Sequence, residues 1–267
     1  MRYSKSGNNR GGVVPQERDR RLLRELALLR IIDREQAKTI AGFGSTTRAN
    51  ARLLALTRAG LLRRFFVATT AGGTKALYAV SREAAELADI PYRGPRRRND
   101  AMLVADSFIH HQLAVNNIYC KLKAEIASHS NAALLRWLTF HEPLTPQLRL
   151  IPDGYFELNT SAGIVASFLE VDLGHEHLKV WRKKIQNYLH LAISGDYERI
   201  FGQNRFRVLI TANSDRRLLG IRNVVRASTG KIFWFTDLAS IDQHGMLATV
   251  WLRPKGEDRA SFISPIL

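Results

Sequence analysis

Apolar residues recur at helical spacing in the first third of the chain, between residues that begin or end helices. Four leucines share one helical face: Leu22, Leu23, Leu26 and Leu29. Because Pro15 suits a first turn, this pattern predicts a helix over residues 15–31. Asp33 and Gln36 have the spacing of a capping box, which predicts a second helix that ends near Ile40, before two glycines.

A third helix is predicted from Ser45, a favourable cap, to Ala59, with Gly60 as its stop signal. Two strand-like runs follow at residues 61–69 and 75–80, and the segment Ala71-Gly72-Gly73 between them is typical of a hairpin. Three helices and a hairpin in this order predict a winged helix-turn-helix over residues 15–91. Residues 1–14, which are polar, basic and Gly-rich, predict a flexible arm.

The pattern changes after residue 91. Residues 92–99 contain Gly, Pro and three consecutive Arg, which predicts a linker, and a long apolar-periodic helix is expected over residues 100–127. Strand-like and helical segments then alternate, which favours an α/β domain around a central sheet at residues 100–267. The predicted fold class is therefore α+β with two domains. The strands are expected at 135–140, 147–151, 155–158, 164–171, 205–211, 231–235 and 247–252, and the helices at 175–193 and 215–227.

The charge is concentrated in the same front third. The chain has 267 residues and a net charge of +16, and residues 1–99 hold 21 basic and 8 acidic side chains. This excess indicates a polyanionic partner, most simply double-stranded DNA, although a solubilising basic surface is the alternative. The single Cys120 excludes a disulfide framework, and neither a signal peptide nor a membrane-spanning run is evident. We therefore expect a cytoplasmic protein that does not enter a membrane.

The start of the third predicted helix offers groups that can read DNA. Arg suits guanine and Asn suits adenine, because each side chain makes two hydrogen bonds to the base edge. Threonines in the first turn suit phosphate contacts, and basic residues on the hairpin suit the DNA backbone. The alternative is a solvated helix face on a dimerisation module. The predicted DNA-binding residues are Thr46, Thr47, Arg48, Asn50, Arg52, Arg63, Arg64 and Lys75.

Three acidic residues stand at or near the ends of strand-like runs. Asp153 follows Ile151-Pro152, while Glu170 and Asp172 alternate along one strand and so share a face. Carboxylates that converge repel one another unless a cation joins them, and Mg²⁺ prefers such oxygen ligands. The cluster is a candidate metal site that could activate a water against a phosphodiester. The alternative is that these acids face solvent.

The helix that follows carries Trp181, Lys184 and Tyr188 on one face, which also holds the apolar residues that pack on the sheet. A lysine on such a stripe requires an acidic partner or an anionic ligand, and the acidic cluster is nearby. The alternatives are a lysine whose ammonium extends to water and a purely structural ion pair.

The strings IPDGYFEL and SFLEVDLG, followed by Lys184-Ile185-Gln186-Asn187-Tyr188, resemble the replication-relaxation family of plasmid and integrative-element proteins. That family pairs a winged helix with a nuclease-like domain of the PD-(D/E)xK superfamily. The resemblance implies Asp153 and Glu170 as the acidic pair. Asp172 occupies the usual lysine position, and Lys184 occupies the glutamine position of a Gln-x-x-x-Tyr helix.

The resemblance implies a DNA-binding accessory protein of plasmid or mobile-element replication, relaxation or mobilisation. Its C-terminal domain would be restriction-endonuclease-like. Either this domain cuts or nicks DNA as a Mg²⁺- or Mn²⁺-dependent enzyme, or it is inactive and mediates protein contacts. The implied catalytic residues are Asp153, Glu170 and Lys184, and the implied metal ligands are Asp153, Glu170 and Asp172. A relaxase or other mobilisation protein and a second copy of the chain are the further expected partners.

Overall fold

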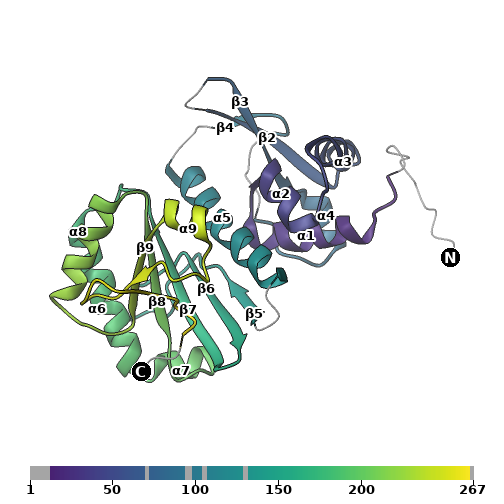
Figure 1. Ribbon diagram of the computed structural model, residues 1–267. Coiled ribbons are helices and arrows are strands. Elements are labelled where there is room, and N and C mark those ends of the chain that lie inside the picture. Colours follow the sequence, from purple (N-terminus) through teal and green to yellow (C-terminus); the bar gives the residue numbers. More distant parts are fainter. Residues whose placement is uncertain (1–12, 70–71, 94–97, 104–106, 129–131, 265–267) are drawn as a thin grey trace, which may run out of the picture. The chain divides into compact units, whose positions relative to one another are not determined.

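The computed structural model describes residues 13–69, 72–93, 98–103, 107–128 and 132–264 (Figure 1). Helices and strands are mixed throughout, which confirms an α+β protein. The chain divides into two compact units, residues 1–116 and 117–267. Most of the expected arm at 1–14 and half of the expected linker at 92–99 lie outside the described residues.

Unit 1 begins with three helices and continues into a small sheet. Its sheet has the strand order β1-β3-β2-β4, in which β1 and β2 both pair antiparallel to β3. The elements are α1 (Glu17–Leu29), β1 (Ile32–Asp33), α2 (Arg34–Ala41), α3 (Thr46–Arg58), β2 (Leu62–Ala68), β3 (Thr74–Val80), α4 (Arg82–Leu87) and β4 (Met102–Leu103). The three predicted helices and the two hairpin strands are confirmed, while β1, α4 and β4 were not predicted.

The caps that the sequence predicts set the ends of these helices. The Asp33 carboxylate accepts a hydrogen bond from the Gln36 backbone N–H, and the Gln36 side chain accepts one from the Asp33 N–H, which completes the capping box of α2. Gly42 ends α2 with a φ of 66°, a conformation that favours glycine. The Ser45 hydroxyl accepts from the Arg48 N–H at the start of α3.

The long helix α5 begins at Ser107 and ends at Ser128, so the expected start at residue 100 was wrong. Asp100 has a φ of 57°, which does not suit a helix, and its carboxylate pairs with Arg64. Residues 102–103 instead form β4, which pairs parallel to β2 at Phe66 and Val67. Strand pairing therefore overrides the helical pattern of this segment.

Unit 2 is built on a seven-stranded sheet with the order β11-β10-β9-β8-β7-β6-β5. Strands β5, β6 and β7 form an antiparallel meander, and β7, β8 and β9 are parallel. The strands are β5 (Ala132–Leu138), β6 (Gly154–Thr160), β7 (Gly163–Asp172), β8 (Arg207–Ala212), β9 (Phe233–Asp237), β10 (Trp251–Leu252) and β11 (Arg259–Ala260). The helices that follow α5 are α6 (Leu178–Ile193), α7 (Asp196–Phe201), α8 (Asp215–Arg226) and α9 (Leu238–His244).

The strand expected at residues 147–151 is absent, although Leu148 and Leu150 are buried. Strand β6 is already paired on both sides, with β5 and β7, so no edge is open beside it. The apolar side chains of this segment contribute to the core without joining a ladder. The prediction mistook a buried irregular segment for a strand because both have runs of apolar residues.

Helices α6 and α8 pack against one face of this sheet (Figure 1). Trp181, Ile185 and Tyr188 of α6 and Ile221 of α8 are fully or almost fully buried there. Alternation along β7 directs Phe168, Glu170 and Asp172 to this same face. The carboxyl-terminal end of β7 therefore places two acidic side chains under α6.

Candidate functional site

The register of β6 and β7 brings Asp153 to Glu170. Gly154 pairs with Leu169, so Asp153, one residue before the strand, stands opposite Glu170. Its Oδ2 atom accepts a hydrogen bond of 2.7 Å from the Val171 backbone N–H. Two acidic residues that are 17 positions apart in sequence are thus held at one end of the sheet.

Glu170 is fully buried, and both of its carboxylate oxygens have partners on α6. The Lys184 Nζ atom lies 2.9 Å from Oε2, and the Tyr188 hydroxyl donates a hydrogen bond of 2.5 Å to Oε1. Lys184 also pairs with Glu176 at 3.0 Å and lies 5.0 Å from the centre of the Trp181 ring. The predicted catalytic residues Asp153, Glu170 and Lys184 are therefore assembled in one cluster, the acidic-end site.

Burial raises the pKa of Glu170 to about 7, while the Lys184 charge acts in the opposite direction and the Asp153 charge adds to the rise. Burial alone would lower the pKa of Lys184. The carboxylates of Glu170, Asp153 and Glu176 outweigh that effect, so the pKa of Lys184 lies above its ordinary value. Lys184 is consequently a cation at neutral pH, and Glu170 is a carboxylate that takes up a proton easily.

Asp172 belongs to a different set of contacts on the same face. Arg217 donates to both of its oxygens at 2.7 Å, the Trp181 Nε1 donates at 2.7 Å, and the Gly174 N–H donates at 2.7 Å. Burial raises the pKa of Asp172, but the hydrogen bonds from Arg217, Trp181 and Gly174 outweigh it, so the pKa is lowered. The structure thus gives Asp172 a network of protein donors.

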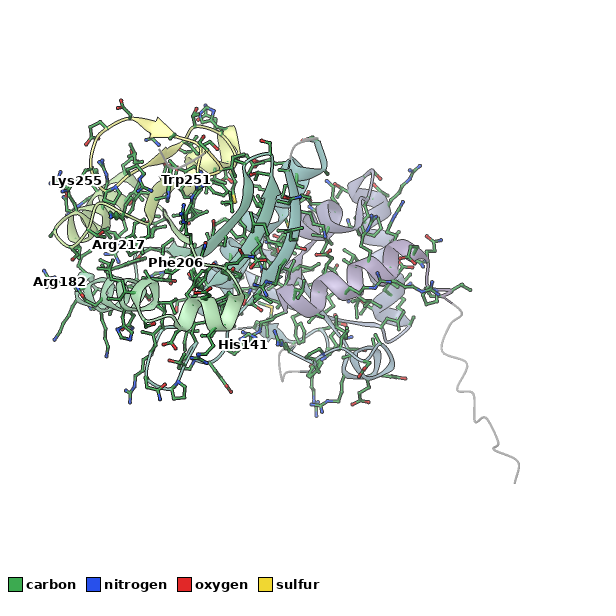
Figure 2. The ribbon with its side chains drawn as sticks, turned by 90° about the horizontal axis from the view of Figure 1, so that it is seen from below. His141, Arg182, Phe206, Arg217, Trp251 and Lys255 are labelled. Carbon is green, nitrogen blue, oxygen red and sulfur yellow. The ribbon has the colours of Figure 1, made fainter. Side chains whose placement is uncertain are left out.

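Arg217 was not among the predicted site residues. It lies in the first turn of α8 and comes from the side of the sheet that α6 also covers (Figure 2). Its ion pair with Asp172 joins residues 45 positions apart. The signal that the sequence offered was the position of Arg217 at the start of a predicted helix that directly follows a predicted strand, since in α/β sheets ligand sites form at the carboxyl ends of the strands.

The donor set limits which residues could hold a metal. Asp153 and Glu170 offer the carboxylate oxygens that Mg²⁺ and Mn²⁺ prefer, but both oxygens of Glu170, like both oxygens of Asp172, already accept hydrogen bonds from protein donors. A metal at Glu170 would have to displace one of these donors. Within the part of the chain that the structure describes, no group of three or more His, Cys, Asp or Glu side chains is arranged to hold a metal ion. A metal at the acidic-end site would therefore depend on two carboxylates and water.

In unit 1, the predicted DNA-binding residues of α3 divide into two groups. Thr47, Arg48 and Asn50 are exposed, while Ala49, Leu53 and other apolar residues pack the opposite face into the core. Thr46 accepts a hydrogen bond of 3.1 Å from Lys38 of α2. The helix thus presents its N-terminal half to solvent and its apolar face to the fold.

Arg52 instead binds Asp19, which is fully buried, and its Nε atom lies 2.9 Å from the Asp19 Oδ1. Burial raises the pKa of Asp19, but the Arg52 hydrogen bond and the Gln16 N–H outweigh that rise and lower it. Arg52 therefore ties α3 to α1.

The predicted residues of the hairpin also have partners within unit 1. Arg63 donates to the Tyr92 hydroxyl at 2.5 Å, and Arg64 pairs with Asp100 at 2.5 Å. Lys75 pairs with the Asp33 carboxylate at 3.0 Å, with about half of its own side chain exposed. These three side chains are thus held by neighbours, and Lys75 is the most accessible of them.

The family model described as replication-relaxation matches residues 21–204, which is well over half of the chain. The chain belongs to the replication-relaxation family. The matched residues include α2, α3 and the acidic-end site, and they end before β8. Comparison with curated proteins and with solved structures gives no match. Membership of the replication-relaxation family suggests a role in replication or mobilisation, with DNA- or mobilisation-related partners.

None of the helices in the described ranges has both the length and the apolar character that crossing a membrane would require.

Proposed function

We propose that the chain is a DNA-binding accessory protein of plasmid or mobile-element replication, relaxation or mobilisation, and that unit 1 is a winged helix-turn-helix that reads double-stranded DNA. The observation that carries the proposal is the exposed N-terminal half of α3, with Thr47, Arg48 and Asn50 turned to solvent.

The topology of unit 1 supports this assignment. The element order α1-β1-α2-α3-β2-β3, with β3 between β1 and β2 in the sheet, is the order of a winged helix. In helix-turn-helix proteins the second helix of the motif enters the major groove and meets base edges with its N-terminal residues. Helix α3 occupies that position.

The chemistry of the exposed residues fits this geometry. Arg48 has the donors for guanine O6 and N7, and Asn50 has the donor and acceptor for adenine. Thr47 stands in the first turn of α3, where backbone N–H groups suit a phosphate. Lys75 and the basic surface of the front third suit further phosphates, which hold the helix in register.

An affinity measurement on the full chain tests this proposal. A binding site is first selected from random duplex DNA, and Arg48→Ala is then compared with Arg58→Ala, which removes an exposed arginine at the other end of α3. A bidentate base contact accounts for about 1–3 kcal/mol, so Arg48→Ala should weaken binding about 5- to 150-fold and relax sequence preference. Arg58→Ala should have a smaller effect that does not depend on sequence. Equal losses in the two variants would contradict the proposal.

A second candidate function is metal-dependent cleavage of DNA by unit 2, which we propose to be a restriction-endonuclease-like domain. The specific support is the assembly of Asp153, Glu170 and Lys184 at one end of the sheet. Asp153 and Glu170 would hold Mg²⁺ or Mn²⁺, which supplies a water of lowered pKa and polarises a phosphodiester. Lys184 would stabilise charge that develops on the phosphate. Asp172 is left out of the ligand set.

Plasmid nicking with Mg²⁺ or Mn²⁺ tests the second candidate. Wild type, Asp153→Ala and Lys184→Met are compared, with Lys183→Met as the matched control because Lys183 is an exposed neighbour on α6. Cleavage that is lost in the first two variants and kept in the control supports the enzyme. A wild-type chain that binds DNA without cleaving it would leave unit 2 as an inactive domain that mediates protein contacts.

A further inference from the structure

The face of the unit 2 sheet opposite α6 holds a pair of arginines, Arg207 and Arg253. Arg207 is the first residue of β8 and pairs with Ser167 of β7. Glu170, three residues after Ser167, faces α6, so strand alternation directs Ser167 and Arg207 to the opposite face. This arginine pair is thus separated from the acidic-end site by the sheet itself.

The two guanidinium groups lie against one indole ring. Arg207 is 7% exposed, and its Nη2 atom donates to the Ser264 carbonyl at 3.0 Å. The centre of the Trp234 ring lies 5.4 Å from the Arg207 Cζ and 4.4 Å from the Arg253 Cζ. Arg253 is fixed further by a contact of 3.4 Å from its Nη2 to the Gly230 carbonyl.

Several donors in this cluster lack an acceptor. Among the described residues, the buried Nη1 atoms of Arg207 and Arg253 have no hydrogen-bond partner, and neither has the buried Trp234 Nε1. The Ser167 hydroxyl is buried without a partner as well. Native folds rarely leave so many buried donors unsatisfied in one place, and guanidinium groups least of all.

Within the described ranges, the cluster also carries positive charge without a carboxylate partner. Burial and the neighbouring charge of Arg253 lower the pKa of Arg207 to about 10. Neither arginine forms an ion pair with a carboxylate in the described part of the chain. Two neighbouring cations without a carboxylate partner favour an anionic acceptor.

A cavity of about 250 Å³ lies beside Arg207. Arg207 forms part of its wall, together with Val165, Ile164 and Phe206, which is labelled in Figure 2. The exposed Arg205 also lines it. The volume is below the usual range for drug-sized ligands, about 300–1,000 Å³, which favours a small anion.

We propose that a phosphate group binds at Arg207, with Arg253 as the second cation and with Ser167 and Trp234 as further donors. A phosphate matches two guanidinium groups because its charge and its several oxygens accept paired N–H donors. Arg207, Trp234 and Arg253 lie on β8, β9 and the segment after β10, beyond the residues that the family model matches, while Ser167 lies on β7 within them, on the face of the sheet opposite the acidic-end site. The proposal is therefore independent of DNA reading by α3 and of cleavage at the acidic-end site.

Calorimetric titration of the full chain with inorganic phosphate, in chloride buffer of matched ionic strength, tests the site. Wild type should bind phosphate at a single saturable site. Arg207→Gln and Arg253→Gln should each bind at least tenfold more weakly, a loss of about 1.4 kcal/mol. Arg205→Gln, which removes a charge from the same cavity wall, should change the affinity less than about twofold.

The source of the phosphate is tested with a 5′-phosphorylated dinucleotide and with the same dinucleotide lacking that phosphate. Tighter binding of the phosphorylated dinucleotide than of inorganic phosphate indicates a nucleic-acid end as the ligand. Equal or weaker binding indicates free phosphate.

Absence of saturable binding in wild type, or equal affinity in all four proteins, would overturn the proposal. Arg253 is partly exposed, so Arg253→Gln decides the question if Arg207→Gln does not fold.

Discussion

The start of α3 in unit 1 and the acidic-end site in unit 2 use polar residues in opposite ways. Thr47, Arg48 and Asn50 are exposed and contribute little to the fold. Glu170 and Lys184 are bound to each other and largely buried, with only 19% of the Lys184 side chain exposed. Exposed groups are available to a macromolecule without rearrangement, whereas matched buried charges stabilise the fold and must exchange partners to act on a ligand. Substitutions at the two places should therefore separate stability from DNA affinity.

The largest effect should come from removing a partner of a buried carboxylate. Arg217→Met leaves Asp172, which is 2% exposed, without its main counter-charge. Breaking such a pair costs about 3–5 kcal/mol of unfolding free energy. Denaturant unfolding of this variant is compared with Arg216→Met, an exposed neighbour that should change stability by less than about 0.5 kcal/mol. Similar unfolding free energies for the two variants would show that the Arg217–Asp172 ion pair does not stabilise the fold.

The two carboxylates under α6 should respond to pH in opposite directions. The pKa of Asp172 is lowered, so its contribution is present above its unfolded value of 3.8 and is lost as the pH falls through the folded value. The pKa of Glu170 is raised from 4.5 to about 7, so its contribution is present below 4.5 and is lost as the pH rises toward 7.

Melting temperatures measured across this pH range test the opposition. Relative to wild type, Asp172→Asn should show its full loss of stability above about pH 4, and this loss should shrink as the pH falls below that value. Glu170→Gln should gain relative stability as the pH rises toward 7, since Gln carries no charge to bury. If the melting temperatures of the two variants changed in parallel with pH, the opposite pKa shifts of Asp172 and Glu170 would be contradicted.

Lys184→Met should destabilise the chain less than Arg217→Met does. The variant keeps the apolar stem, and Glu170 can take up a proton because burial raises its pKa to about 7. A hydrogen bond to a charged group contributes about 1.5–3 kcal/mol, and protonation of Glu170 limits the loss to about the lower figure. Denaturant unfolding of wild type and Lys184→Met at pH 6 and pH 8 measures this loss of unfolding free energy. A loss that is larger at pH 6 than at pH 8 would contradict this explanation.

The smallest effect on stability is expected at Arg48, in the N-terminal half of α3. Arg48→Ala removes an exposed side chain, and such changes usually lie within about 0.5 kcal/mol. Arg52→Met should be destabilising instead, because it leaves the buried Asp19 without its cation. Thermal unfolding of the two variants, one turn apart on α3, checks this difference. A large loss in Arg48→Ala would show that the N-terminal half of α3 supports the fold.

Local signals accounted for most of unit 1 and for the positions of the acidic residues. The caps at Asp33 and Ser45 are local, so the sequence predicted α2 and α3 closely. The same holds for Asp153 and Glu170, whose places at strand ends follow from the apolar runs beside them. Lys184 was placed correctly on the inward face of α6 because helical periodicity and burial coincide there.

Long-range pairing accounted for the differences. The contact of Arg217 with Asp172 depends on the pairing of β8 with β7. The local sequence pattern does not show which strands pair. Arg52 has a side chain that could contact a base, and it stands at the middle of α3. It instead binds the buried carboxylate of Asp19, 33 positions earlier in the sequence. Residues 102–103 belonged to the predicted long helix, but they form strand β4, which pairs with β2. In each case a distant residue outweighed the local pattern.

Reading of DNA by α3 is tested by the affinity of the full chain for its selected site and for random duplex, measured over a range of salt concentrations. Arg48→Ala should lose most of the preference for the selected site while its melting temperature stays close to that of wild type. Lys184→Met should keep the preference and lose stability. Unchanged preference in Arg48→Ala, together with a loss of preference in folded Lys184→Met, would show that α3 does not read DNA.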